Sequence, residues 1–87
     1  MNLILVRFNL DCGRNGNLVG TFATSEKVLN SLIGKEIYFG ECLGKHSDVS
    51  STMEENMFEV LCKDQDFIAS AQEYGLIPSG YNPIDYL

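Results

Sequence analysis

The chain has few of the residues that build catalytic or metal sites. Its 87 residues include no Trp, a single His, three Cys and two Pro. The longest apolar run, from Leu3 to Val6, has four residues, whereas a membrane-spanning helix needs about 20. No basic leader precedes that run, and Arg7 ends it, so we expect neither a signal peptide nor a membrane segment.

The number and spacing of the cysteines indicate neither a set of disulfide bonds nor a metal centre. Cys12, Cys42 and Cys62 are odd in number and no two are close in the sequence, which indicates a reducing, cytoplasmic compartment. Together with His46 they would make four zinc ligands, but their spacing matches no common zinc motif and no CxxC pair is present. We therefore expect no metal and no cofactor.

What the chain does have is enough apolar sequence for one core. Hydrophobic residues make up 45% and charged residues 21%, which are the proportions of a soluble globular protein. A chain of this length buries about 60–65% of its unfolded surface. We expect a single compact domain over residues 1–87.

Acidic residues are concentrated in the second half of the chain. Residues 1–45 carry five basic and four acidic side chains, whereas residues 46–87 carry one basic and eight acidic ones, and the net charge of the whole chain is −6. An acidic surface repels nucleic acid and attracts a basic surface of another protein. The alternative is that these charges only keep a small protein soluble.

Apolar and polar residues alternate near the start of the chain. Residues 2–10 and 18–23 are expected to be two strands of a hairpin, because Asn15-Gly16 between them is typical of a turn with positive φ. The apolar side chains that share one face of the first strand are Ile4, Val6, Phe8 and Leu10.

After the hairpin, apolar residues recur at the spacing of a helix. Residues 25–33 are expected to form a helix that ends at Gly34. A second helix is expected to begin at Asp64 or Asp66 and to end at Gly75. Its expected apolar face consists of Phe67, Ile68, Ala71 and Tyr74.

Two further strands complete the expected α+β fold, at residues 35–43 and 58–63, while residues 44–57 show little regularity. The order is β-β-α-β-β-α. It predicts an antiparallel sheet of about four strands with both helices on one face. The tail, residues 76–87, is too apolar to be free, so it either packs on the body in extended form or docks on a partner.

The loop from Gly44 to Asp48 is the densest polar cluster. It is not a P-loop, because the glycines are too close together and His46 separates Lys45 from Ser47. Lys45, His46 and Ser47, joined by Arg14, would still hold a phosphate or a nucleotide. The alternative is a solvated turn.

Catalysis is not expected. His46, Ser47 and Asp48 are consecutive, and neighbouring side chains do not readily form a Ser-His-Asp relay. With one His and no orienting motif, we expect a protein that is not an enzyme.

The leading hypothesis is an inhibitor that uses an acidic face to occupy a basic, nucleic-acid-binding surface of a nuclease or defence enzyme, without binding nucleic acid itself. In size, acidity and lack of catalytic motifs the chain resembles the small anti-restriction and anti-CRISPR proteins of phages, and immunity proteins and antitoxins share this profile. If it is phage-encoded, the compartment is the cytoplasm of the host cell. The expected partner-binding residues are Glu54, Glu55, Glu59, Asp64 and Asp66.

The second hypothesis is a small-ligand binder, or sponge, that uses the loop from Gly44 to Asp48. An 87-residue monomer has little room for a deep pocket. A homodimer could build one at its interface, so a dimer would favour this hypothesis and a monomer with an acidic face would favour the first.

Overall fold

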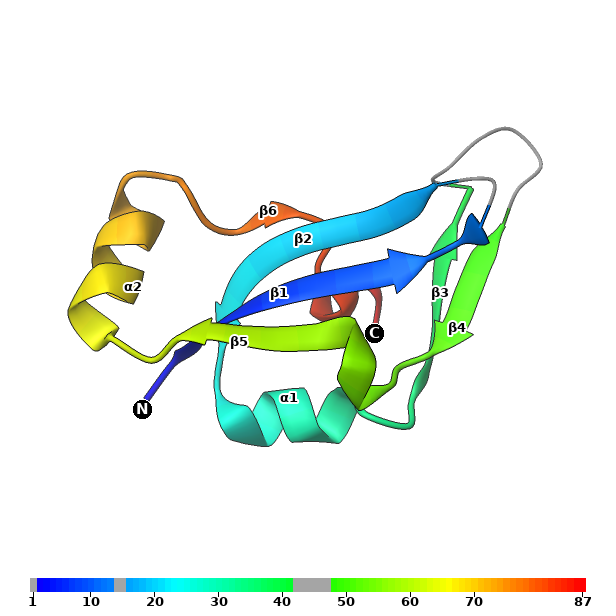
Figure 1. Ribbon diagram of the computed structural model, residues 1–87, viewed down its shortest axis with the longest axis horizontal. Helices are drawn as coiled ribbons and strands as arrows, with labels where there is room; N and C mark the ends of the chain where they lie inside the picture. Colours follow the sequence, from blue (N-terminus) through cyan, green and yellow to red (C-terminus); the bar gives the residue numbers. More distant parts are fainter. Residues whose placement is uncertain (1, 14–15, 42–47) are drawn as a thin grey trace.

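The computed structural model describes residues 2–13, 16–41 and 48–87, and it confirms an α+β fold (Figure 1). The molecule measures 41 × 26 × 19 Å along its principal axes. The elements, in chain order, are β1 (Ile4–Asp11), β2 (Asn17–Thr24), α1 (Glu26–Leu32), β3 (Glu36–Gly40), β4 (Val49–Thr52), η2 (Glu55–Met57), β5 (Phe58–Cys62), α2 (Gln65–Glu73), β6 (Ser79–Gly80) and η3 (Pro83–Tyr86).

The expected hairpin is the centre of the fold. β1 and β2 pair antiparallel from Ile4 opposite Thr24 to Asp11 opposite Asn17. They lie in a four-stranded sheet whose order is β5-β1-β2-β6, with every neighbouring pair antiparallel. The predicted antiparallel sheet of about four strands is therefore confirmed.

The inner face of this sheet carries the main core. Alternate residues of β1 point to this face, and Phe8 is fully buried there with its ring centroid 5.9 Å from that of Phe39 and 5.3 Å from that of Phe58. Burying each large apolar side chain contributes about 1.5–3 kcal/mol, so this cluster holds the fold together. Its buried members are Ile4, Val6, Phe8, Leu10, Leu18, Phe22, Leu29, Leu32, Ile37, Phe39, Val49 and Met53.

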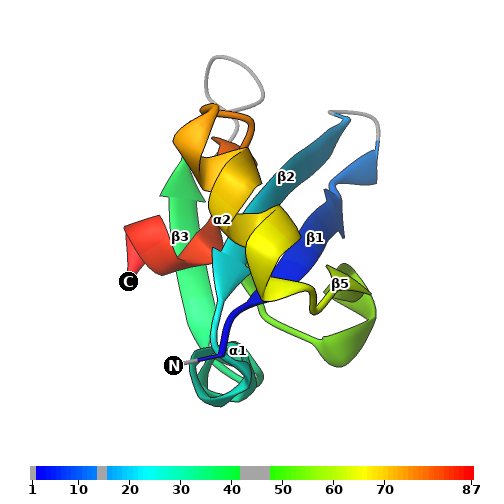
Figure 2. The ribbon, with the colours of Figure 1, turned by 90° about the vertical axis from the view of Figure 1, so that its left-hand side faces the viewer.

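The outer face carries a smaller cluster, formed by Leu5, Ile68, Ala71 and Ile77. α2 supplies two of these residues, whereas α1 packs in the inner cluster through Leu29 and Leu32. The two helices therefore lie on different faces of the sheet (Figure 2), which corrects the expectation that both share one face. The reason is that the start of β1 is apolar on both faces.

Local capping explains the helix boundaries. The Ser25 hydroxyl accepts a hydrogen bond from the Val28 amide at 3.2 Å, which begins α1. One Asp64 carboxylate oxygen accepts from the amides of Asp66 and Phe67, so Asp64 is the residue that caps α2.

The C-terminal end of α2 has the expected glycine cap. The Leu76 amide donates to the Ala71 carbonyl at 2.9 Å, and Gly75 has a φ of 74°. The predicted apolar face of α2 is only half right: Ile68 and Ala71 are buried, but Phe67 and Tyr74 are 53% and 78% exposed. The helix touches the body through one narrow stripe, because little sheet lies beneath it.

The third expected strand does not join the central sheet. β3 pairs with β4 in a separate two-stranded sheet, which covers the inner face (Figure 1). β4 and η2 lie in the stretch that the sequence left irregular. The sequence of β4, Val-Ser-Ser-Thr, has no apolar alternation to mark it as a strand.

The C-terminal segment packs on the body at both of its short elements. β6 pairs with β2, where Gly20 faces Gly80. A side chain on Gly20 would overlap the backbone of Tyr81, so glycine is what permits this approach. In η3, Pro83 is buried, and the ring centroid of Tyr86 lies 4.9 Å from the ring centroid of Phe39.

Candidate acidic interface

The five acidic residues singled out from the sequence lie along one edge of the central sheet. β5 is the outermost strand of that sheet, and η2 and α2 lie directly before and after it. These residues are Glu54, Glu55, Glu59, Asp64 and Asp66, and all five are exposed.

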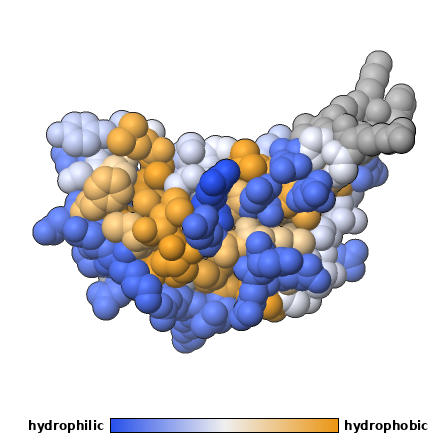
Figure 3. Space-filling view, in the orientation of Figure 1, coloured by the Kyte–Doolittle hydropathy of each residue, from blue (hydrophilic) through white to orange (hydrophobic). Residues whose placement is uncertain are grey.

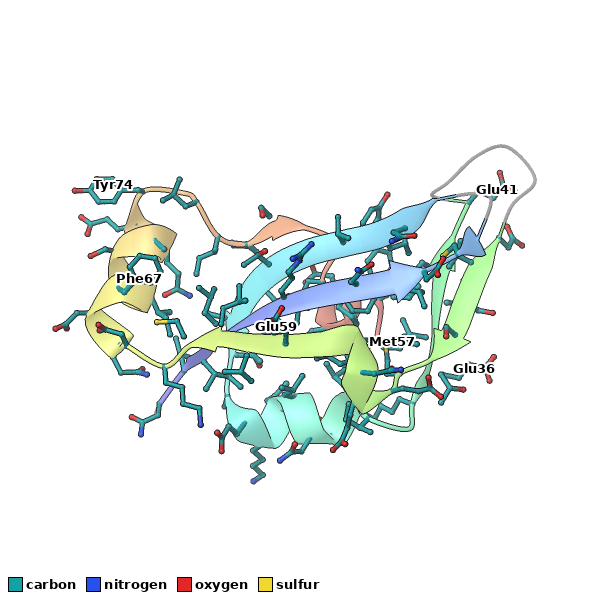
Figure 4. The ribbon with its side chains drawn as sticks, viewed as in Figure 1. Glu36, Glu41, Met57, Glu59, Phe67 and Tyr74 are labelled. Atoms are coloured by element: carbon teal, nitrogen blue, oxygen red, sulfur yellow. The ribbon has the colours of Figure 1, made fainter. Side chains whose placement is uncertain are left out.

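The fold separates these residues into two groups. Asp64 and Asp66 lie at the start of α2, where Asp64 uses a carboxylate oxygen to cap the helix. Glu54 and Glu55 lie at the opposite end of β5, a strand of five residues that spans about 17 Å. Glu59 stands on β5 between them, away from Phe67 and Tyr74 on α2 (Figure 4).

A groove runs between the second half of β1 on one side and η2 with β4 on the other. Its middle is a hollow of about 350 Å³. Hollows of about 170 Å³ and about 250 Å³ adjoin it and share lining residues with it. We call this the interstrand groove, and its middle part is lined by Asn9, Leu10, Asp11, Glu54, Asn56 and Met57.

The charged side chains among the described residues that line the interstrand groove are mostly acidic. Asp11 and Glu54 line its middle and Asp48 lines one end. Glu59 lines the other end together with Arg7, which is the one cation among the described lining residues. Leu10, Val49 and Met57 add apolar surface. An acidic wall over an apolar floor suits a basic segment that also carries apolar side chains.

Asp11 and Asp48 were not among the expected partner-binding residues. Asp11 belongs to the end of β1 and also accepts a hydrogen bond from the Gly13 amide at 2.8 Å. Asp48 directly precedes β4. Asp11 lines one hollow with Glu54 and the adjoining hollow with Asp48, because the end of β1 lies beside β4 and η2. No local sequence pattern predicts this contact.

The only basic residue of the second half, Lys63, is already engaged. Its ammonium group lies 3.0 Å from a carboxylate oxygen of Glu26 on α1. It therefore links α1 to the segment between β5 and α2. The acidic residues around η2 receive no charge compensation from it.

The alternative ligand site falls outside the described part of the chain. Arg14, Lys45, His46 and Ser47 all lie outside residues 2–13, 16–41 and 48–87, as does Cys42. Within those ranges no three His, Cys, Asp or Glu side chains are grouped as metal ligands would be. The described cysteines, Cys12 and Cys62, are both half-buried, and the Cys12 thiol donates a hydrogen bond to the Leu10 carbonyl at 3.8 Å.

Exposed apolar side chains lie apart from the interstrand groove. Val60 and Leu61 of β5 are 44% and 46% exposed, and Phe67, Tyr74 and Leu76 are more exposed still. The space-filling view shows hydrophobic surface gathered where α2 meets the sheet, with hydrophilic surface around it (Figure 3). This surface continues the outer cluster, so it belongs to the seam between α2 and the sheet.

Comparisons with protein families, with curated proteins and with solved structures return no match to this chain. Among the described residues, no helix has the length and apolar character needed to cross a membrane.

Proposed function

We propose that this protein is a non-enzymatic interaction protein that binds a basic surface of another protein and thereby inhibits it. The interstrand groove carries the proposal, because Asp11 and Glu54 line its middle and Asp48 lines one of its ends. A partner that meets all three at once gains more from complementary charge than a partner that meets one.

The partner class follows from the sign and the density of charge. The chain carries a net charge of −6, and the segment from Glu54 to Asp66 holds five acidic residues against one lysine. A groove that normally holds nucleic acid is the basic surface that such a protein would occupy best, since it already attracts a line of negative charges. We therefore propose that the partner is a nuclease or another nucleic-acid enzyme, in the cytoplasm.

The surroundings of the acidic side chains give little support to a catalytic role. Asp11 is partly used by the Gly13 amide and Asp64 caps a helix. The remaining acidic side chains near η2 are exposed to water.

The test compares how strongly the wild-type chain and its charge-reversal variants inhibit a captured partner. Proteins retained from a host lysate by the wild-type chain would be purified and assayed for binding to nucleic acid, with and without the chain. We expect loss of nucleic-acid binding in the presence of the wild type, and recovery when Glu54, Glu55 and Glu59 are changed to Lys. Glu36, an exposed residue of β3 that does not line the groove, gives a single-charge control as Glu36→Lys, which should inhibit as well as the wild type.

Two outcomes would overturn the proposal. One is equal inhibition by the wild type and by the triple Lys variant. The other is direct binding of the chain to nucleic acid at physiological salt. Retention of a small phosphorylated molecule in native mass spectrometry, with no protein partner, would favour the sponge hypothesis instead.

A further inference from the structure

The strand β1 is paired with a neighbour along only part of one of its two edges. β1 pairs with β2 along all eight of its residues, but β5 pairs with β1 only from Leu5 to Phe8. Beyond Phe8, the chain of β5 has already turned into η2. In the described part of the chain, no strand pairs with residues 9–11 of β1 on that side, and this is the side that the interstrand groove occupies.

The direction of the backbone groups of β1 follows from the hairpin. The Cys12 amide donates to the Gly16 carbonyl at 2.9 Å, which continues the register in which Asp11 faces Asn17. In an antiparallel pair, residues that bond to one neighbour alternate with residues that face the other side. The even-numbered residues of β1 therefore bond to β2, and Asn9 and Asp11 turn their amides and carbonyls toward the groove.

The opposite wall also presents a strand edge. The Met53 amide donates to the Lys35 carbonyl, and the Gly34 amide donates to the Met53 carbonyl, both at 2.8 Å. The same alternation then directs the backbone groups of Ser50 and Thr52 away from β3. Ser50 lines the groove together with Leu10 and Asp11, so two strand edges border one hollow.

We propose that the interstrand groove receives an extended, basic segment of the partner, which adds as a strand against residues 9–11 of β1. This rests on the proposed function and specifies how the partner is held. Backbone hydrogen bonds to Asn9 and Asp11 supply affinity, and alternate side chains of the segment meet either the apolar floor or the acidic wall.

Charge selects a basic partner segment over a second copy of this chain. Asp11, Asp48 and Glu54 line the groove, and each copy carries a net charge of −6. Pairing two such edges would bring like charges together, which opposes association. Lysine or arginine side chains on the incoming strand would reverse the sign of that interaction.

The first experiment separates strand pairing from attraction between charges. An eight-residue peptide of alternating Lys and Val would be titrated into the full chain and followed by NMR. An analogue with the same side chains and charge but with every backbone amide nitrogen methylated is the control, because it donates no backbone hydrogen bonds. We expect the methylated peptide to bind about tenfold more weakly, and the unmethylated one to protect the amides of Asn9 and Asp11 from exchange.

A pair of protein variants tests the same edge from the other side. Asn9→Pro removes the amide that faces the groove, at an edge position where proline is tolerated, whereas Asn9→Ala keeps the amide. We expect about tenfold weaker peptide binding for Asn9→Pro and nearly unchanged binding for Asn9→Ala. If Asn9→Pro does not fold, the test rests on the wild type, in which the unmethylated peptide should protect the amides of Asn9 and Asp11 from exchange.

The outcomes distinguish this inference from the function on which it rests. Equal binding of the two peptides, or protection confined to β5, would overturn strand addition and leave charge-driven inhibition standing. If neither peptide binds, strand addition is also overturned, and the inhibition assay with the triple Lys variant decides the proposed function separately.

Discussion

The two faces of the central sheet differ in how much of the molecule they hold. The inner face buries 12 core residues from both hairpin strands, α1, β3, β4 and the segment after β4. The outer face buries four, around α2. Adjacent residues of β1, Leu5 and Val6, point to opposite clusters. From this difference we expect the inner side to set global stability and α2 to contribute mainly to its own region.

The largest expected effect is at the centre of the inner face. Phe8→Ala removes a fully buried ring that contacts Phe39 and Phe58, which should lower the free energy of unfolding by about 3–5 kcal/mol. Urea denaturation measures this loss. Phe8→Leu is the control and should lose much less. A loss below about 1 kcal/mol for Phe8→Ala would mean that the inner cluster does not dominate stability.

The corresponding change on the outer face should act locally. Ile68→Ala empties a buried position under α2, and we expect a loss of about 2 kcal/mol, near the lower end of the range for such changes. Hydrogen exchange should show faster exchange for α2 and unchanged protection in β1. Equal loss of protection in both would show that the two clusters unfold as one unit.

Removing the cap of α2 should have a smaller effect on the same element. Asp64→Ala deletes the acceptor for the amides of Asp66 and Phe67, at an expected cost of about 1 kcal/mol. Asp64→Asn keeps an acceptor and should be nearly neutral. If both variants lose the same stability, the charge of Asp64 matters rather than its hydrogen bonds.

The smallest effect concerns the ion pair that joins the two regions. Lys63 and Glu26 lie 3.0 Å apart, and their side chains are 66% and 64% exposed, so the pair should contribute less than about 0.5 kcal/mol. A double-mutant cycle with Lys63→Met and Glu26→Gln measures the coupling directly. A coupling above about 1 kcal/mol would tie α1 and α2 more closely than their separate clusters indicate.

Elements with strong local signals could be predicted from the sequence. The alternation from Ile4 to Leu10 identified the inner face of β1. The helices were also expected close to where they begin, at residue 25 and at Asp64 or Asp66, and the structure shows that Ser25 and Asp64 are the caps. These features depend on neighbours within a few residues. Local chemistry therefore decides them before the chain folds.

Features that depend on distant contacts could not be predicted in this way. β4 has a polar sequence, and it is a strand because β3 lies beside it. Phe67 has the spacing of a core residue, yet it is exposed because no layer covers that side of α2. The acidic groove is of the same kind, since Asp11 and Glu54 are far apart in the sequence and meet only in the folded chain.

The contact between β2 and β6 has a consequence for the history of this sequence. Gly80 has a φ of 70°, and a side chain there would overlap the Val19 carbonyl, just as a side chain on Gly20 would overlap Tyr81. Each glycine thus leaves room for the backbone of the facing segment, so the close approach of β2 and β6 requires both. In any related chain that keeps this fold, the two positions should be inherited together or lost together, and this pair of glycines offers a signature by which distant relatives can be recognised.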